Sequence, residues 1–250
     1  MGVYLGNTEI GQMFLGSTEI SKAYIGTSLV FSSGDSPTPQ QGYITNGLAF
    51  HLDGLERGGV AGHWIDKVGN VDFSLTNCTE NADNIQFSTS LHSTAAAASI
   101  GNFQSNVCTI EAVLERDNTK AGIFTTPTNG GICLAIHQAN NQIGFNATGR
   151  ALYRYNYTSS THTGKQMLSV NDDVALCNGV VLTRNSTNTV FVNSTVPTVG
   201  SFTGNYSDLW WFNGKIYAIR IYSRKLTQAE MLQNQQVDNE RFNLGLTITT

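Results

Sequence analysis

Charged side chains and long hydrophobic runs are both scarce in this chain of 250 residues. Lysine, arginine, aspartate and glutamate make up only 13% of it, about half of the ~25% that is usual for soluble domains. This shortage excludes a coiled coil, a long-helix protein and a chain kept disordered by its own charge. No apolar run approaches the ~18 residues that span a bilayer, so we expect no membrane insertion.

Basic clusters and a secretory leader are also missing. The formal net charge is −4, and no run rich in lysine or arginine occurs, which argues against nucleic acid and anionic membranes as partners. The first residues, from Met1 to Asn7, do not place a basic stretch before an apolar one, so no signal peptide is expected. We therefore expect a protein that is made in a cytoplasm.

Cysteine and histidine show no spacing that is typical of a metal site. The four cysteines form no Cys-x-x-Cys pair, and we expect reduced, partly buried thiols. The cysteines are Cys78, Cys108, Cys133 and Cys177. The histidines are scattered, so we predict no metal site. Asp172 and Asp173, beside Asn171, offer an alternative Ca²⁺ site, but a solvated turn is favoured and no cofactor is expected.

A ten-residue repeat is the clearest pattern present. Three segments with the order aromatic, aliphatic, Gly, polar, Thr/Ser, any residue, aliphatic begin at Tyr4, Phe14 and Tyr24. Glycine favours a turn, and aromatic and β-branched residues favour short strands, so each segment predicts a strand–turn–strand element. An isolated small hairpin is marginal in water. We therefore predict that residues 1–31 form an anchoring or assembly arm, with an ordinary β-meander on the main domain as the alternative.

The arm needs an apolar contact surface, which the main domain, a sister copy in an oligomer or a larger assembly would have to provide. The side chains predicted for that assembly interface are the aromatic and aliphatic members of the repeats. They are Tyr4, Leu5, Ile10, Phe14, Leu15, Ile20, Tyr24, Ile25 and Val30. Residues 32–42, which hold two of the four prolines, predict an extended linker between this arm and a domain spanning residues 43–250.

The sequence of the main domain predicts an all-β fold with one short C-terminal helix. Short strand patterns alternate with turn signals from Tyr43 onward, and residues 107–115 alternate with period two. Many short strands and little helix are typical of a two-sheet antiparallel sandwich or jelly roll. The helix is predicted from the capping box that Thr227 and Glu230 form, and it extends towards Val237.

Four segments carry a resemblance to concanavalin A-like, laminin G-like domains. They are GLAFHLDG at residues 47–54, HWIDKVGN at 63–70, TIEA at 109–112 and the stretch 214–227, which is the most specific. The resemblance covers about 200 residues and implies two antiparallel sheets in jelly-roll order. An N-terminal β-repeat arm would precede this sandwich.

The N-terminal repeats resemble short repeats in bacteriophage structural proteins, where they often precede a laminin G-like domain. Together the two resemblances imply a non-enzymatic virion structural protein, such as a capsid decoration, a head fibre or a tail or baseplate appendage. They also imply other virion proteins as partners, a homo-oligomer such as a trimer, and assembly into the virion after synthesis in the host bacterial cytoplasm. A stand-alone lectin and, less favoured, a glycoside hydrolase are the alternatives.

A catalytic pair is not expected. Laminarinase-type glycosidases of this fold carry a Glu-x-Asp-x-x-Glu pattern, and the nearest match here is Glu111 and Glu115 without the central aspartate. Four residues of strand separate these carboxylates by about 13 Å, whereas the chemistry needs ~5 Å or ~6.5–9.5 Å. A solvated strand face is therefore the favoured interpretation of both.

Aromatic side chains offer a better argument for glycan binding. Tyr153, Tyr155 and Tyr157 fall on one strand face, with Arg154 and Asn156 opposite. Exposed aromatics beside amides suit the apolar face and hydroxyl edges of a sugar, such as a host surface glycan. A stripe that faces the core is the alternative, and it is favoured.

Two further aromatic segments are predicted to pack inside the domain. Trp64 is expected in the core, with Asp66 forming a turn. At least one of the consecutive residues Trp210, Trp211 and Phe212 must point inward, so core packing is favoured there as well.

Overall fold

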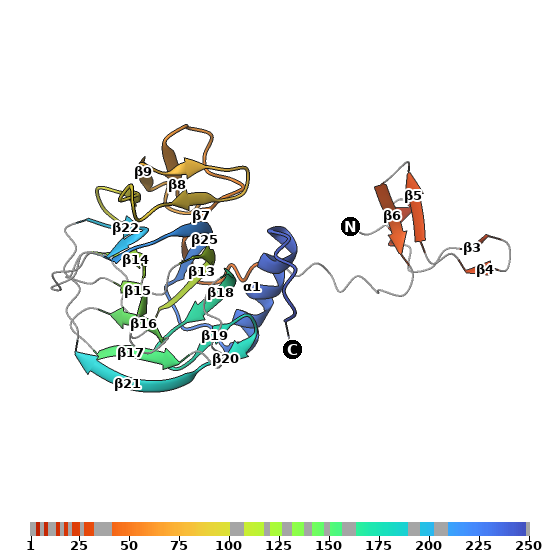
Figure 1. Cartoon of the computed structure of the whole chain (residues 1–250). Coiled ribbons are helices and arrows are strands. Elements are labelled where there is room, and N and C mark those ends of the chain that lie inside the picture. The colour runs from red at the N-terminus through yellow and green to blue at the C-terminus, as the bar shows by residue number, and fades with distance from the viewer. Residues whose placement is uncertain are drawn as a thin grey trace. The chain divides into compact units, whose positions relative to one another are not determined.

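The structure is a computed structural model that divides into two compact units, Met1–Tyr43 and Ile44–Thr250, which are described separately (Figure 1). The residues that it describes are six short strands before residue 33 and the ranges 42–100, 108–117, 121–126, 132–137, 142–147, 151–156, 164–189, 196–202 and 210–248. The predicted linker lies outside these ranges except at its two ends.

The first unit contains an antiparallel hairpin in each of the three repeats, as the repeat predicts. The hairpins pair β1 (Tyr4–Leu5) with β2 (Thr8–Glu9), β3 (Phe14–Leu15) with β4 (Thr18–Glu19), and β5 (Lys22–Ile25) with β6 (Ser28–Ser32). Two residues that begin with glycine connect the paired strands in every repeat, and Gly-X sequences are typical of two-residue hairpin connections. Of the predicted interface residues, Ile10 and Ile20 lie outside the described residues, and the others lie in these strands.

The second unit is an all-β sandwich of two antiparallel sheets, as predicted. The eight-stranded sheet contains β7 (Leu48–Asp53), β10 (Thr79–Glu80), β11 (Ile85–Phe87), β13 (Thr109–Arg116), β18 (Gly164–Val170), β19 (Ala175–Cys177), β20 (Val180–Val181) and β25 (Gly214–Tyr222). Its order is β10-β11-β25-β13-β18-β19-β20, and β7 also pairs with β25.

The nine-stranded sheet has the order β21-β17-β16-β15-β14-β22-β12-β9-β8. Its strands are β8 (His63–Ile65), β9 (Asp72–Thr76), β12 (Thr94–Ala96), β14 (Ala121–Thr125), β15 (Ile132–His137), β16 (Gln142–Ala147), β17 (Ala151–Asn156), β21 (Thr183–Thr189) and β22 (Thr198–Val199). A small hairpin of β23 (Ser201–Phe202) and β24 (Trp210–Trp211) lies beside β14.

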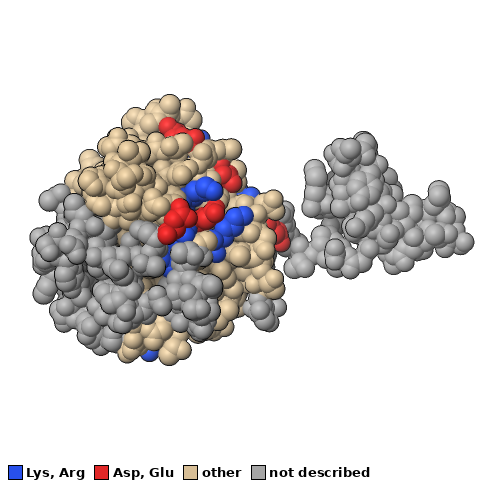
Figure 2. Space-filling view, in the orientation of Figure 1, with Lys and Arg blue, Asp and Glu red and all other residues tan. Residues whose placement is uncertain are grey.

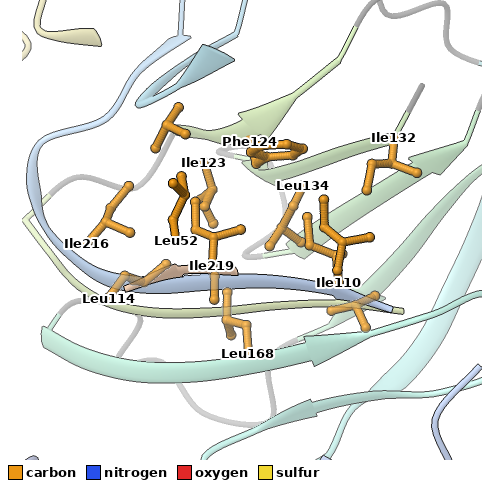
Figure 3. Packing of buried hydrophobic residues seen from close by; sticks show 14 of the residues in the cluster. Leu52, Ile110, Leu114, Ile123, Phe124, Ile132, Leu134, Leu168, Ile216 and Ile219 are labelled. Carbon is orange, nitrogen blue, oxygen red and sulfur yellow. The ribbon is translucent and has the colours of Figure 1, made fainter. Parts of the chain in front are cut away.

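The core lies between the two sheets, and Figure 3 shows side chains from both of them pointing toward one another. In β13, Ile110, Ala112 and Leu114 face inward, as the period-two pattern predicts. Phe50 of the eight-stranded sheet contacts Phe124 of the other, with ring centroids 5.6 Å apart. Burying a side chain of this size stabilises a fold by roughly 1.5–3 kcal/mol.

Helix α1 (Gln228–Arg241) covers part of the outer face of the eight-stranded sheet. The predicted capping box is present: Thr227 Oγ1 accepts from the Glu230 N–H at 3.3 Å, and Glu230 Oε2 accepts from the Thr227 N–H at 2.8 Å. The helix continues one turn beyond the predicted end. Its buried residues are mostly polar, namely Met231, Asn234, Gln235 and Asp238.

A bulge in β25 explains the apolar residues on both faces of that strand. Val113 of β13 pairs with Ala218, whereas its neighbour Leu114 pairs with Ile216, so Tyr217 is an extra residue. Tyr217 and Ala218 both pack on the outer face of the sheet, against Phe242 and the C-terminal tail. Period two alone would have placed one of them in the core.

Candidate functional site

Glu111 lies beneath helix α1 and is only 1% exposed. Its Oε2 accepts hydrogen bonds from Arg220 Nε at 3.0 Å and Asn234 Nδ2 at 2.9 Å, and its Oε1 accepts one from Ser169 Oγ at 2.9 Å. Burial raises the pKa of Glu111, and the nearby Arg220 opposes that shift. The expectation of a solvated strand face is therefore wrong for Glu111, because helix α1 covers this carboxylate.

Glu115, the other carboxylate of the pair, is in a different environment. It is partly exposed, and its Oε2 accepts hydrogen bonds from Lys215 Nζ at 3.2 Å and the Tyr217 hydroxyl at 3.1 Å. The two glutamates therefore share a strand face, but one is buried and the other is partly exposed.

A second set of charged groups joins the loop after β7 to the end of helix α1. The fully buried Asp53 lies 2.7 Å from Arg241 and 3.7 Å from Lys67, and Glu56 contacts both of these cations at 2.6 and 2.5 Å. Figure 2 shows acidic and basic side chains gathered on the visible face, in the region of β7 and β25 in Figure 1. Burial, followed by the charges of Arg220, Lys67 and Arg241, lowers the pKa of His51 to about 2, so its imidazole is neutral. The cluster pairs its charges internally and fits a structural role.

The predicted turn residue, Asp66, has the role that its spacing indicates. Its carboxylate accepts hydrogen bonds from the backbone N–H groups of His51, Val68 and Gly69 at 2.6, 3.1 and 2.6 Å. Trp64 beside it is fully buried, as predicted, and its indole N–H donates to the Asp53 carbonyl at 3.0 Å.

The alternative Ca²⁺ site is closed by an ammonium group. Lys225 Nζ lies 2.7 Å from Asp172 Oδ1 and 2.8 Å from Asp173 Oδ2. Among the residues that the structure describes, no group of three or more His, Cys, Asp or Glu could hold a metal ion. The two aspartates of this turn are therefore bridged by the Lys225 ammonium group.

The cysteines are free thiols, two buried and two partly buried. Burial raises the pKa of Cys78, Cys108 and Cys177 to about 12 and also raises that of Cys133. Thiolate is the nucleophilic and metal-binding form, so these thiols stay protonated and unreactive near neutral pH.

Of the three tyrosines predicted as a sugar platform, the structure describes the side chain of Tyr155 alone. Tyr155 is buried, and its hydroxyl donates to the Asn171 carbonyl at 2.8 Å. Tyr153 pairs in register with the buried Phe145. The side chain of Tyr153 and the whole of Tyr157 lie outside the described residues. Tyr155 therefore belongs to the core, which is the alternative that the sequence favoured.

A partly exposed aromatic pair lies elsewhere, where the exposed His92 stacks on the half-buried Trp211. Their ring centroids are 4.8 Å apart and the rings are inclined by 19°. In the β23–β24 hairpin, Trp211 pairs with Ser201. The next residue, Phe212, is buried against Phe87. Because neighbouring residues of an extended chain point to opposite sides, burying Phe212 leaves Trp211 only half-buried.

The loop of residues 88–93 holds His92 in place. Its turn is closed by hydrogen bonds from the Ser93 N–H to the Ser88 carbonyl at 3.0 Å and from the His92 N–H to the Thr89 carbonyl at 3.2 Å. His92 has a φ of 52°, a left-handed conformation that costs a non-glycine residue about 1 kcal/mol or more. Beside it, Leu91 is 59% exposed.

Amide side chains make hydrogen bonds to the loop that carries His92. Asn77 Nδ2 donates to the Leu91 carbonyl at 2.9 Å, and Asn213 links the loop to Asp117 through contacts of 3.4 Å. We name the surface formed by Leu91, His92 and Trp211 the aromatic surface. Flat rings beside amides and hydroxyls suit a sugar, which has an apolar face and polar edges.

Sequence reasoning missed the aromatic surface because it favoured core packing for the Trp-Trp-Phe segment and did not say which of the three rings would face outward. An apolar Leu91 beside His92 in a serine-rich loop is the sequence signal that could have found it. The side chain of Trp210 lies outside the described residues.

No protein-family model and no curated protein matches this sequence. Among solved structures, domain 4 of AbnA, a GH43 extracellular arabinanase from Geobacillus stearothermophilus in complex with arabinotriose, is 15% identical. That match covers 76% of this chain and 97% of that domain with a TM-score of 0.51. The binding domain of Botulinum neurotoxin DC in complex with rat synaptotagmin II is 12% identical over 77% of this chain and 51% of that one, with a TM-score of 0.54.

Trypanosoma rangeli sialidase in complex with sialic acid is 14% identical over 87% of this chain, with a TM-score of 0.50. This chain spans only 36% of the sialidase's length. In the described part of this chain, the helix is too short and too polar to cross a membrane. At these identities the similarity extends to architecture alone: the chain has an all-β sandwich fold that these three proteins share.

Proposed function

We propose that this protein is a non-enzymatic, carbohydrate-binding protein whose sandwich binds a glycan at the aromatic surface. The observation that carries the proposal is the stack of His92 on Trp211, held outside the core by the burial of Phe212. A protein of similar fold, domain 4 of the arabinanase AbnA, is in complex with a sugar, arabinotriose, which supports a glycan as the ligand class.

Replacing Trp211 with alanine should weaken glycan binding at least tenfold, since truncating a central aromatic residue of an interface costs about 1.4 kcal/mol or more. Screening the intact protein on a glycan array and titrating its best ligand into both forms measures the effect. Val180→Ala, which removes part of an exposed side chain on β20, is the matched control and should bind as the parent does. Equal affinity of Trp211→Ala and the parent would contradict a site on the aromatic surface.

We further propose that the protein is a bacteriophage virion component, anchored by residues 1–31 and displaying the sandwich. The three hairpins support this role, because strands of two to five residues are too short for an isolated hairpin to be stable in water. They need apolar cover, which we assign to sister copies or to capsid or tail proteins.

Deleting residues 1–31 should therefore abolish incorporation into particles and reduce the protein to a single copy. Quantifying the protein in purified particles, with mass photometry of the free protein, checks both effects. The truncated protein should still bind the glycan, since the aromatic surface lies in the second unit. Undiminished incorporation would remove the anchoring role, and tight glycan binding by a monomeric full chain would favour the stand-alone lectin.

A further inference from the structure

We infer that the glycan bound at the aromatic surface is uncharged and that acidic sugars are excluded from it. This inference rests on the proposed carbohydrate-binding function and narrows its ligand class. It is drawn from the distribution of charge around the ring pair.

The strands that support the aromatic surface carry no basic residue. No lysine or arginine occurs between Lys67 and Arg116, or between Arg184 and Lys215. These two stretches contain β9 to β12 and β22 to β24, and β14 holds none either. Because β14, β22, β12 and β9 are consecutive in the nine-stranded sheet, the strands of this part of the sheet and of the hairpin beside it contribute no lysine or arginine among the described residues.

Three of the four basic residues that border these stretches contact other partners. Lys67 Nζ lies 2.5 Å from Glu56, and Lys215 Nζ lies 3.2 Å from Glu115. Arg116 is fully buried and donates to Gln166 at 3.2 Å. None of these three side chains, as the described part of the chain places them, offers a charge to a ligand on the aromatic surface.

Hydrogen bonds connect the loop of residues 88–93 to an acidic group, the carboxylate of Asp117. The Thr89 N–H donates to Asn213 Oδ1, and Asn213 Nδ2 donates to Asp117 Oδ2, both at 3.4 Å. The whole chain also carries a net charge of −4. An anionic sugar would lose part of its hydration at the rings and gain no counter-charge, whereas a neutral sugar needs only apolar contact and hydrogen bonds.

The test compares matched glycans that differ only in charge. Galactose-terminated oligosaccharides and their sialylated forms are titrated into the full chain at low and at physiological ionic strength. We expect the neutral form to bind at least tenfold more tightly than the sialylated form. This difference in affinity should decrease at higher ionic strength, because salt screens the repulsion between the sialylated glycan and the negatively charged protein. Binding of the neutral form should also depend on Trp211.

A variant with an added positive charge tests whether the lack of a cation causes the preference for neutral glycans. Ser90 is exposed in the loop that carries His92, so Ser90→Lys should improve binding of the sialylated glycan severalfold and leave the neutral one nearly unchanged. Thr183→Lys, on the exposed start of β21 at the far end of the sheet order, is the matched control and should change neither affinity.

The outcomes distinguish failure of the neutral-ligand inference from failure of the proposed carbohydrate-binding function. Binding of sialylated glycans with equal or greater affinity than their neutral partners would overturn the neutral-ligand inference and leave carbohydrate binding in place. Absence of binding to every glycan tested would overturn the proposed function itself. Neutral binding that Trp211→Ala does not weaken would overturn the placement of the ligand on the aromatic surface.

Discussion

Replacing Arg220 with methionine should destabilise the sandwich by about 3–5 kcal/mol, the cost of removing one partner from a buried ion pair. Arg220 is 1% exposed and lies between two carboxylates, Glu111 and Asp238, which are both about as buried. It contacts Glu111 at 3.0 Å and pairs with Asp238 through both terminal nitrogens. Without it, two acidic groups would remain between the sheet and the helix with no cation between them.

Urea denaturation followed by circular dichroism measures this loss. The matched control is Arg184→Met, which removes an exposed arginine and should change stability by less than about 1 kcal/mol. A decisive variant combines Arg220→Met with Glu111→Gln and Asp238→Asn, which removes all three charges together. Because the penalty arises from unpaired buried charge, this triple variant should recover most of the lost stability. A triple variant as unstable as Arg220→Met alone would show that packing, rather than charge, is the cause.

Replacing Gly214 with alanine is expected to be nearly as damaging, with a loss of about 3 kcal/mol or more from combined overpacking and backbone strain. A Cβ at this position would lie 2.1 Å from the Glu115 carbonyl oxygen, and the residue has a φ of 134°. The obstacle is the backbone of the neighbouring strand β13, so no side chain can rotate away to make room. Gly214 starts β25, which pairs with β11, β13 and β7, so the strain acts on the centre of the eight-stranded sheet.

The variant Gly62→Ala separates the effect of backbone strain from the effect of overpacking on stability. Gly62 also has a positive φ, of 78°, but a Cβ there would meet no atom within 4 Å. It should therefore lose only about 1 kcal/mol, the cost of the backbone conformation alone. Thermal unfolding of both variants compares them directly, and equal losses would show that the close approach to Glu115 is not what requires glycine at position 214.

Local patterns predicted the elements of this fold well because their causes are local. The capping box needs only Thr227 and Glu230, three residues apart, and both of its hydrogen bonds are present. The Gly-centred repeats need only a short connection between two strands, and all three hairpins formed. Period-two alternation in β13 correctly separated inward from outward residues.

The environment of Glu111 could not be read in the same way. Alternation places Glu111 on the outer face of its strand but does not say what covers that face. The cover is helix α1, more than a hundred residues later in the sequence, whose buried face is polar and so lacks the apolar stripe by which packing helices are recognised. A bulge at Tyr217 shifts the register of β25 against β13, and period two does not predict such an insertion.

The amino-acid order was sufficient for the three N-terminal hairpins, strand β13, the capped helix and the all-β class, because propensity, periodicity and capping act between residues a few positions apart. Which aromatic rings reach solvent was settled by long-range packing. His92 and Trp211 are more than a hundred residues apart, and they meet because a loop between β11 and β12 lies against the β23–β24 hairpin. The burial of Tyr155 and the exposure of the aromatic surface both depend on contacts between distant strands, and such contacts leave no periodic trace in the chain.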